Sequence, residues 1–84
     1  MSQDPKPWYR ARSHAALGAA VQGARQSAGL NQDQLAELAA TSRPTLSRLE
    51  RGMPTSTSVL LEALAASGYE VIVVPRGARV RLED

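Results

Sequence analysis

The sequence predicts a small all-α domain of four to five helices followed by one short β-strand. Apolar residues recur at helical spacing along most of the 84-residue chain, and glycines separate the helical stretches. A β-branched run follows the last of these stretches. We predict a flexible N-terminal arm (residues 1–12), a helical domain (13–68), and a C-terminal strand with a basic tail (69–84).

The first predicted helix begins after Ser13, which can cap it, and runs to about Ser27 before Gly29 stops it. Its apolar face consists of residues three or four apart, namely Leu17, Val21, Ala24 and Ala28. Gly18 and Gly23 weaken this helix but allow a neighbour to approach closely. In the arm, Trp8 and Tyr9 are expected to pack against this helix, and a contact with DNA or a partner is the alternative.

Residues 30–52 are predicted to form two short helices joined by a tight turn. Asn31 and Gln34 make a capping box for the first of them, and Ser42 caps the second, which ends at Gly52. The expected inward-facing residues are Leu35, Leu38, Ala39, Leu46 and Leu49. This pattern is typical of a helix-turn-helix, whose second helix enters the major groove of DNA.

A fourth helix is predicted from Thr55 or Ser56 to the glycine at position 68. The run after it is too short for a helix and rich in β-branched residues, so we predict a strand made of Glu70, Val71, Ile72, Val73 and Val74. A single strand leaves both edges unpaired. It could form a hairpin with residues 79–82, or pair with the same strand of a second chain. We favour the second arrangement, because a two-fold dimer suits a reader of palindromic DNA.

The composition argues against several functional classes. Cysteine is absent, which excludes disulfides and thiolate metal sites, and His14 is the only histidine, so we expect no metal and no cofactor. We see no credible catalytic set and expect no enzyme. No apolar run is long enough to cross a bilayer, and the polar N-terminus is no signal peptide. The net charge is only +2, but the arginines are clustered at positions 43, 48 and 51 and at positions 76, 79 and 81.

The segments Leu30-Asn31-Gln32, Gln34-Leu35-Ala36 and Ser42 to Gly52 (SRPTLSRLERG) resemble the Cro/Xre-type helix-turn-helix of phage repressors and bacterial regulators. The resemblance covers residues 13–68 and implies a lambda-repressor-like fold that binds double-stranded DNA. Two positions depart from the family pattern. Ala40 stands where the family usually has glycine, and Thr41 stands where it usually has valine.

The resemblance also implies roles for individual residues. The expected base-reading residues are Arg43, Pro44, Thr45, Ser47 and Arg48, and arginine pairs naturally with guanine. The expected phosphate contacts are Gln32, Ser42 and Arg51. Arg25 and Glu50 are expected to form a structural ion pair between the first and third helices.

The tail from Ser67 to Pro75 resembles that of HipB-type antitoxins. This likeness implies a cytoplasmic, nucleoid-associated bacterial homodimer joined by its strands, which represses its own operon at a palindromic operator and binds a HipA-like kinase toxin. One alternative is a stand-alone phage-type or restriction-controller regulator without a toxin. Another is a protein-interaction module that has kept the fold and lost DNA binding.

Overall fold

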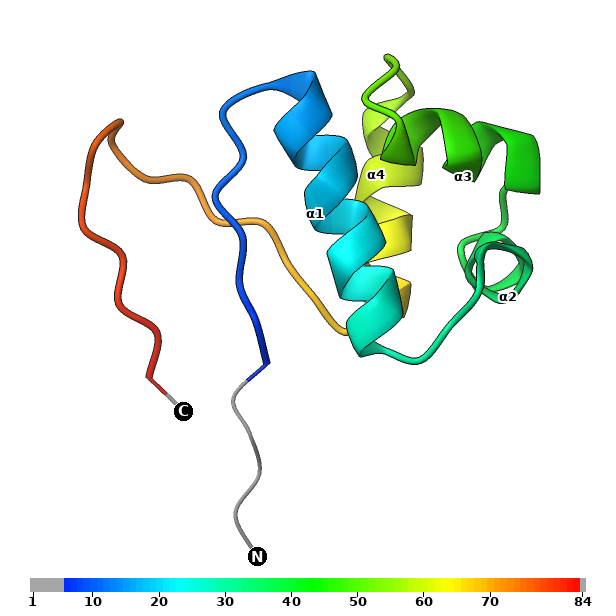
Figure 1. Cartoon of the computed structure of the whole chain (residues 1–84), viewed down its shortest axis with the longest axis horizontal. Coiled ribbons are helices and arrows are strands. Elements are labelled where there is room, and N and C mark those ends of the chain that lie inside the picture. The colour runs from blue at the N-terminus through cyan, green and yellow to red at the C-terminus, as the bar shows by residue number, and fades with distance from the viewer. Residues whose placement is uncertain (1–5, 84) are drawn as a thin grey trace, which may run out of the picture.

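The structure, a computed structural model, describes residues 6–83 and contains four helices in that range. They are α1 (His14–Ser27), α2 (Gln32–Leu38), α3 (Arg43–Glu50) and α4 (Thr57–Ala66). α1 and α2 each pack against both α3 and α4. The extended N- and C-terminal segments lie on the side of α1 that faces away from α2 and α3 (Figure 1). The all-α prediction is confirmed with four helices. The parts of the arm and tail at positions 1–5 and 84 lie outside the described residues.

Every helix begins at a side-chain cap that the sequence indicates. The side-chain oxygens of Ser13, Asn31, Ser42 and Ser56 each accept a hydrogen bond from the backbone amide three residues later. Gln34 completes the capping box by accepting from the backbone amide of Asn31 at 2.9 Å. Because these bonds are local, the helix starts could be predicted closely. For α4 the cap is Ser56 rather than the residue before it.

All four helices end in the same hydrogen-bonded motif, in which one residue takes a left-handed conformation. In three helices this residue is a glycine with φ between 73° and 83°, namely Gly29, Gly52 and Gly68. At the end of α2 it is Ala40, with φ of 54°. Thr41 then donates its amide to the carbonyl of Ala36 at 2.9 Å, which completes the motif. The helix-turn-helix turn therefore forms without its usual glycine, and Ala40 carries the strain.

Replacing Ala40 with glycine should stabilise the protein. An L-residue in the left-handed region costs about 1–2 kcal/mol, and the extra freedom of glycine in the unfolded chain offsets part of that gain. We expect Ala40→Gly to raise the free energy of unfolding by about 0.5–1 kcal/mol, measured by urea denaturation. Ala65→Gly, at an exposed helical position of α4, should lower it by about 1 kcal/mol. A lower midpoint for Ala40→Gly would contradict the strain argument.

The core lies where the four helices meet. Val21, Leu35 and Leu46 are its largest fully buried side chains. The prediction that Leu38 faces inward is wrong, because its side chain is 61% exposed. α2 turns Leu35, Ala36 and Ala39 toward the core, and Leu38 lies beside that face. Ala28, also predicted to be inward-facing, is the exposed C-cap residue of α1.

Gly18 lets α1 contact the end of α3 directly. A Cβ at this position would lie 2.5 Å from the carbonyl oxygen of Leu49 and 2.6 Å from that of Glu50. Both atoms belong to backbone and could not move aside easily. The prediction that glycines in α1 allow a close neighbour is confirmed at this position, and the contact fixes α3 against α1.

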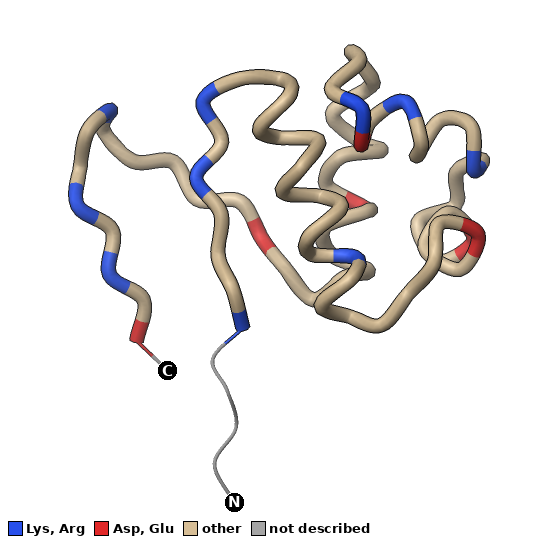
Figure 2. Tube along the Cα trace, viewed as in Figure 1, with Lys and Arg blue, Asp and Glu red and all other residues tan. Residues whose placement is uncertain are grey.

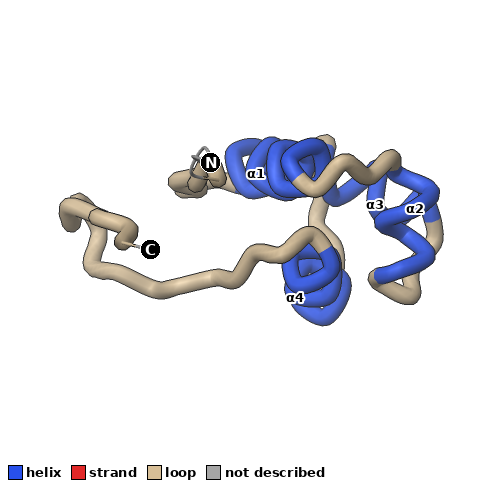
Figure 3. The backbone as a smooth tube through the Cα atoms, turned by 90° about the horizontal axis from the view of Figure 1, so that it is seen from below, coloured by secondary structure: helices blue, strands red, loops and turns tan. Residues whose placement is uncertain are grey.

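The predicted C-terminal strand is absent from the described residues. None of the backbone hydrogen bonds found there involves residues 70–74, which run away from the helices as an extended loop (Figure 3). A turn follows them at residues 75–78, where Ala78 donates to the carbonyl of Pro75 at 3.0 Å and Gly77 has φ of 82°. Among the described non-glycine residues only Ala40 has a positive φ, so this is not one of the primed turns that two-residue hairpins favour. Residues 79–82 accordingly do not pair back, and the hairpin alternative is wrong.

Candidate nucleic-acid interface

α3 has one buried side and one open side. Leu46, Leu49 and Glu50 point into the protein, and the opposite side of the helix exposes Pro44, Arg48 and the C-cap residue Arg51. Figure 2 shows two groups of basic residues, one along α3 and one on the N- and C-terminal segments, besides Arg25 in the last turn of α1. Because Pro44 lies in the first turn, its missing amide interrupts no helical hydrogen bond. The open side of α3 is thus basic and free of any covering element among the described residues.

Glu50 joins three helices through hydrogen bonds. Arg25 of α1 donates to its carboxylate twice, from Nε at 2.7 Å and from Nη2 at 3.0 Å, and both side chains are nearly buried. Gln32 of α2 donates from Nε2 to the same carboxylate at 3.1 Å. Arg25 also donates to the carbonyl of Leu30, just before α2, at 3.0 Å. The predicted ion pair is present, and it fixes α3 to α2 as well as to α1.

Gln32 and Arg43 meet at the edge of α3 that faces α2. Arg43 Nε donates to Gln32 Oε1 at 3.4 Å, and its Nη1 lies 3.7 Å from Asp33 Oδ2. Arg43 therefore has neighbours on α2, whereas no ion pair involves Arg48 in the described part of the chain. In the sequence the two arginines are indistinguishable in role, and the contact with Asp33 was not predicted. The position of Asp33, one residue after Gln32, was the sequence signal for this contact.

Of the three hydroxyl groups predicted to contact DNA, those of Ser42 and Thr45 are hydrogen-bonded to each other within the protein. Ser42 caps α3 and donates from Oγ to Thr45 Oγ1 at 2.9 Å. Thr45 and Ser47 are half-buried, and Ser42 is exposed. Each hydroxyl keeps further hydrogen-bonding capacity, because a hydroxyl oxygen has one donor and two acceptor positions.

A profile of the helix-turn-helix domain family matches residues 16–71, which is more than half of the chain. The chain belongs to the Cro/Xre-type helix-turn-helix family. A search of curated proteins gave no significant match.

Several solved structures resemble this helix-turn-helix protein. The clp gene regulator ClgR from Corynebacterium glutamicum is 34% identical, with a TM-score of 0.64 over 82% of this chain and 85% of that one. A chain of a toxin-antitoxin module from Streptococcus pneumoniae is 30% identical, with a TM-score of 0.60 over 75% and 70%. A complex of a HipB variant with an O2 20mer matches in fold at 20% identity, with a TM-score of 0.74 over 83% and 99%, and so does the HipA-HipB-O2-O3 complex at 0.73.

The start of α4 adds a feature to this helix-turn-helix surface that was not predicted from the sequence. A hollow of about 220 Å³ lies between α3 and α4, and Thr45, Arg48 and the α4 cap Ser56 contribute to its lining. Arg48 therefore lies next to the first turn of α4. The sequence signal was available, because a serine cap marks the helix end whose free amides attract anions.

Within residues 6–83, histidine and acidic side chains form no group of three that could hold a metal ion. In the same range, no helix has the length and apolar character that crossing a membrane requires.

Asp33 should weaken DNA binding, because it places a negative charge beside Arg43 on the basic side of the protein. Asp33→Asn keeps the size of the side chain and should tighten operator binding by about 0.2–1 kcal/mol, or roughly 1.5- to 5-fold. The gain should shrink as salt rises, since both side chains are exposed. Glu62→Gln makes the same charge change on an exposed part of α4 and serves as the control. If the two variants tightened binding equally, the effect would come from net charge and not from the position of Asp33 beside Arg43.

Proposed function

We propose that this protein is a sequence-specific DNA-binding transcriptional repressor that inserts α3 into the major groove. The observation that carries the proposal is the open side of α3, where Pro44, Arg48 and Arg51 are exposed, while Glu50 on the opposite side is hydrogen-bonded to α1. A rigid helix with exposed arginines suits the major groove in width and in hydrogen-bonding chemistry. The likeness to ClgR, named as a gene regulator, supports the same class.

The proposed contacts with DNA are assigned from the position of each residue. The base-reading set is Arg43, Pro44, Thr45, Ser47 and Arg48, and the phosphate contacts are Gln32, Ser42 and Arg51. Arg48 is the principal reader, because no ion pair among the described residues holds it. The start of α4 at Ser56 offers a further phosphate contact beside it. Residues 13–68 are the reading domain in this proposal.

The proposed active form is a homodimer in which residues 70–74 of two chains pair as antiparallel strands. Val71, Ile72 and Val74 are each at least two-fifths exposed, and Val73 is 95% exposed. An extended apolar segment whose backbone N–H and C=O groups are unpaired readily pairs with a strand of another chain. Two reading helices related by a two-fold axis would then meet half-sites about 34 Å apart, or a multiple of that distance.

The proposed biological setting is a toxin-antitoxin pair on the bacterial nucleoid, in the cytoplasm. The chain would repress its own operon and bind a HipA-like kinase toxin. The likeness to the Streptococcus pneumoniae module and the HipB-like fold support this setting. A stand-alone regulator is the second candidate, which the higher identity to ClgR favours. A kinase-like toxin encoded beside this chain, and neutralised when the two are co-expressed, would decide for the antitoxin.

Selection of bound fragments from random DNA tests the proposal directly. We expect a palindromic consensus, with guanines placed where arginines can reach their O6 and N7 atoms. Affinity for that consensus should fall steeply as salt rises, because bound phosphates release counterions. Recovery of no consensus, together with no salt-dependent binding, would leave a protein-interaction module as the function.

A further inference from the structure

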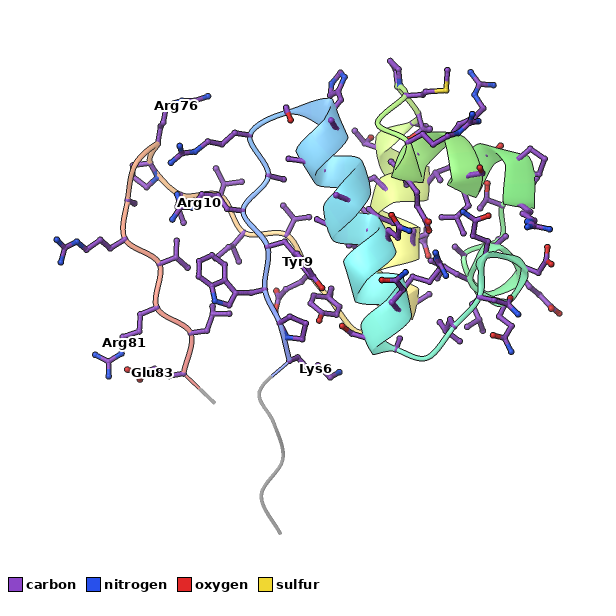
Figure 4. All side chains as sticks on the ribbon, in the orientation of Figure 1. Lys6, Tyr9, Arg10, Arg76, Arg81 and Glu83 are labelled. Atoms are coloured by element: carbon purple, nitrogen blue, oxygen red, sulfur yellow. The ribbon has the colours of Figure 1, made fainter. Side chains whose placement is uncertain are left out.

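The N-terminal arm (residues 6–12) contacts both α1 and the C-terminal segment. The ring of Tyr9 lies against Gly23 of α1 and packs on the ring of Tyr69, with centroids 6.2 Å apart and planes at 47°. Tyr69 in turn donates its hydroxyl hydrogen to the carbonyl of Pro7 at 2.8 Å. Figure 4 shows Tyr9 reaching from the arm toward α1.

A second contact ties the arm to the chain beyond residues 70–74. Arg10 Nη2 donates to the carbonyl of Ala78 at 3.0 Å, within the turn that follows Pro75. The arm accordingly runs between α1 and the C-terminal segment (Figure 1). Residues 70–74 are therefore bracketed, with Tyr69 held on one side and Ala78 on the other.

Gly23 is what allows Tyr9 to lie so close to α1. A Cβ at this position would lie 2.5 Å from Cζ and 2.7 Å from Cε1 of the Tyr9 ring. These atoms belong to a side chain on an extended arm, so the arm would move and the helix would not. A glycine inside a helix costs about 1 kcal/mol relative to alanine, and here the space it leaves is filled by Tyr9.

We infer that Tyr9, Gly23 and Tyr69 form a clasp that sets the direction of residues 70–74 relative to α3, and so determines which half-site spacing the dimer accepts. The inference rests on the proposed function. Residues 70–74 make no backbone hydrogen bond among those described, so the hydrogen bonds that hold this part of the chain lie at its two ends, in the clasp and at Arg10. Two reading helices joined through flexible segments can engage half-sites at many separations, whereas rigidly joined ones select a single separation.

Gly23→Ala tests the clasp, because the added methyl displaces Tyr9 while alanine favours the helix. Gln22→Ala, at the exposed neighbouring position, is the matched control, since it alters the helix without touching Tyr9. Tyr69→Phe is a second variant that removes only the hydrogen bond to Pro7. The first readout is the nuclear Overhauser effect between the rings of Tyr9 and Tyr69. It should be present in the parent and in Gln22→Ala, and lost in Gly23→Ala.

The second readout is affinity for operators whose two half-sites are moved apart by added base pairs. The parent and Gln22→Ala should prefer one spacing by about 10²-fold, as expected when geometry controls simultaneous binding. Gly23→Ala should bind an isolated half-site as the parent does and lose most of that preference. Tyr69→Phe should lose part of it.

Three results would overturn the inference, and each can be told apart. Absence of the ring-to-ring effect in the parent would mean that the clasp does not form. Loss of that effect in Gly23→Ala with an unchanged spacing preference would mean that the clasp has no positioning role. Failure of the parent to bind any DNA sequence-specifically would remove the proposed function and the spacing role together, while the spectra would still report the contact.

Discussion

Arg25→Ala should lower the free energy of unfolding by about 3–5 kcal/mol, because it leaves the carboxylate of Glu50 buried without its cationic partner. The side chain of Glu50 is only 4% exposed, and Gln32 would remain as its one neutral donor. The carbonyl of Leu30 would lose a donor as well. Such a loss is a large fraction of the roughly 5–15 kcal/mol that stabilises a typical native protein. Thermal and urea denaturation would measure it.

Two further variants separate the buried pair from a general effect of charge. Arg76→Ala removes an exposed arginine and should change stability by no more than about 0.5 kcal/mol. The double variant Arg25→Met, Glu50→Leu removes both charges and should recover much of the loss, because apolar replacements of a buried pair are often neutral. An unchanged melting temperature for Arg25→Ala would contradict the role assigned to the pair.

Arg48→Ala should weaken operator binding by about 1–3 kcal/mol and relax the preference at one base pair of each half-site. The side chain is exposed on the open side of α3, so its removal should leave the fold intact. Arg48→Lys keeps the positive charge but lacks the planar fork that pairs with guanine. We therefore expect Arg48→Lys to retain much of the overall affinity and to lose the same base preference. Binding titrations on the selected consensus and its single-base variants would measure both quantities.

The control for Arg48 is Arg81→Ala, which removes an exposed arginine of the C-terminal segment. The Nε atom of Arg81 lies 3.4 Å from Oε1 of Glu83, and this side chain is remote from α3 (Figure 4). It should change neither the base preference nor the affinity for an isolated half-site. If Arg48→Ala bound every single-base variant with the relative affinities of the parent, α3 would not be the reading helix.

The helix boundaries could be predicted from the sequence because they depend on neighbouring residues. Ser13, Asn31 and Ser42 cap helices through bonds that span three residues, and glycines such as Gly29 end them within one turn. The ion pair of Arg25 and Glu50 spans 25 positions, and it was predictable only through the resemblance to a known family.

Features that depend on distant or absent partners were not predictable. The strand at residues 70–74 needs a ladder partner, and a single chain supplies none in the described range. The exposure of Leu38 depends on how α2 is rotated against its neighbours, which a helix this short does not reveal in its spacing. The contact between Tyr9 and Tyr69 joins the two ends of the chain, and no local pattern announces it.

The hydrogen bonds to Glu50 limit how small a fragment of this chain can be and still fold. The segment from Leu30 to Gly52 looks self-sufficient in sequence, yet the carboxylate that steadies it receives two of its hydrogen bonds from Arg25, outside that segment. A peptide cut to the motif alone would carry an orphaned acid and two short, unsupported helices. Anyone transplanting this motif onto another scaffold would need to bring α1 along, or provide an arginine in its place.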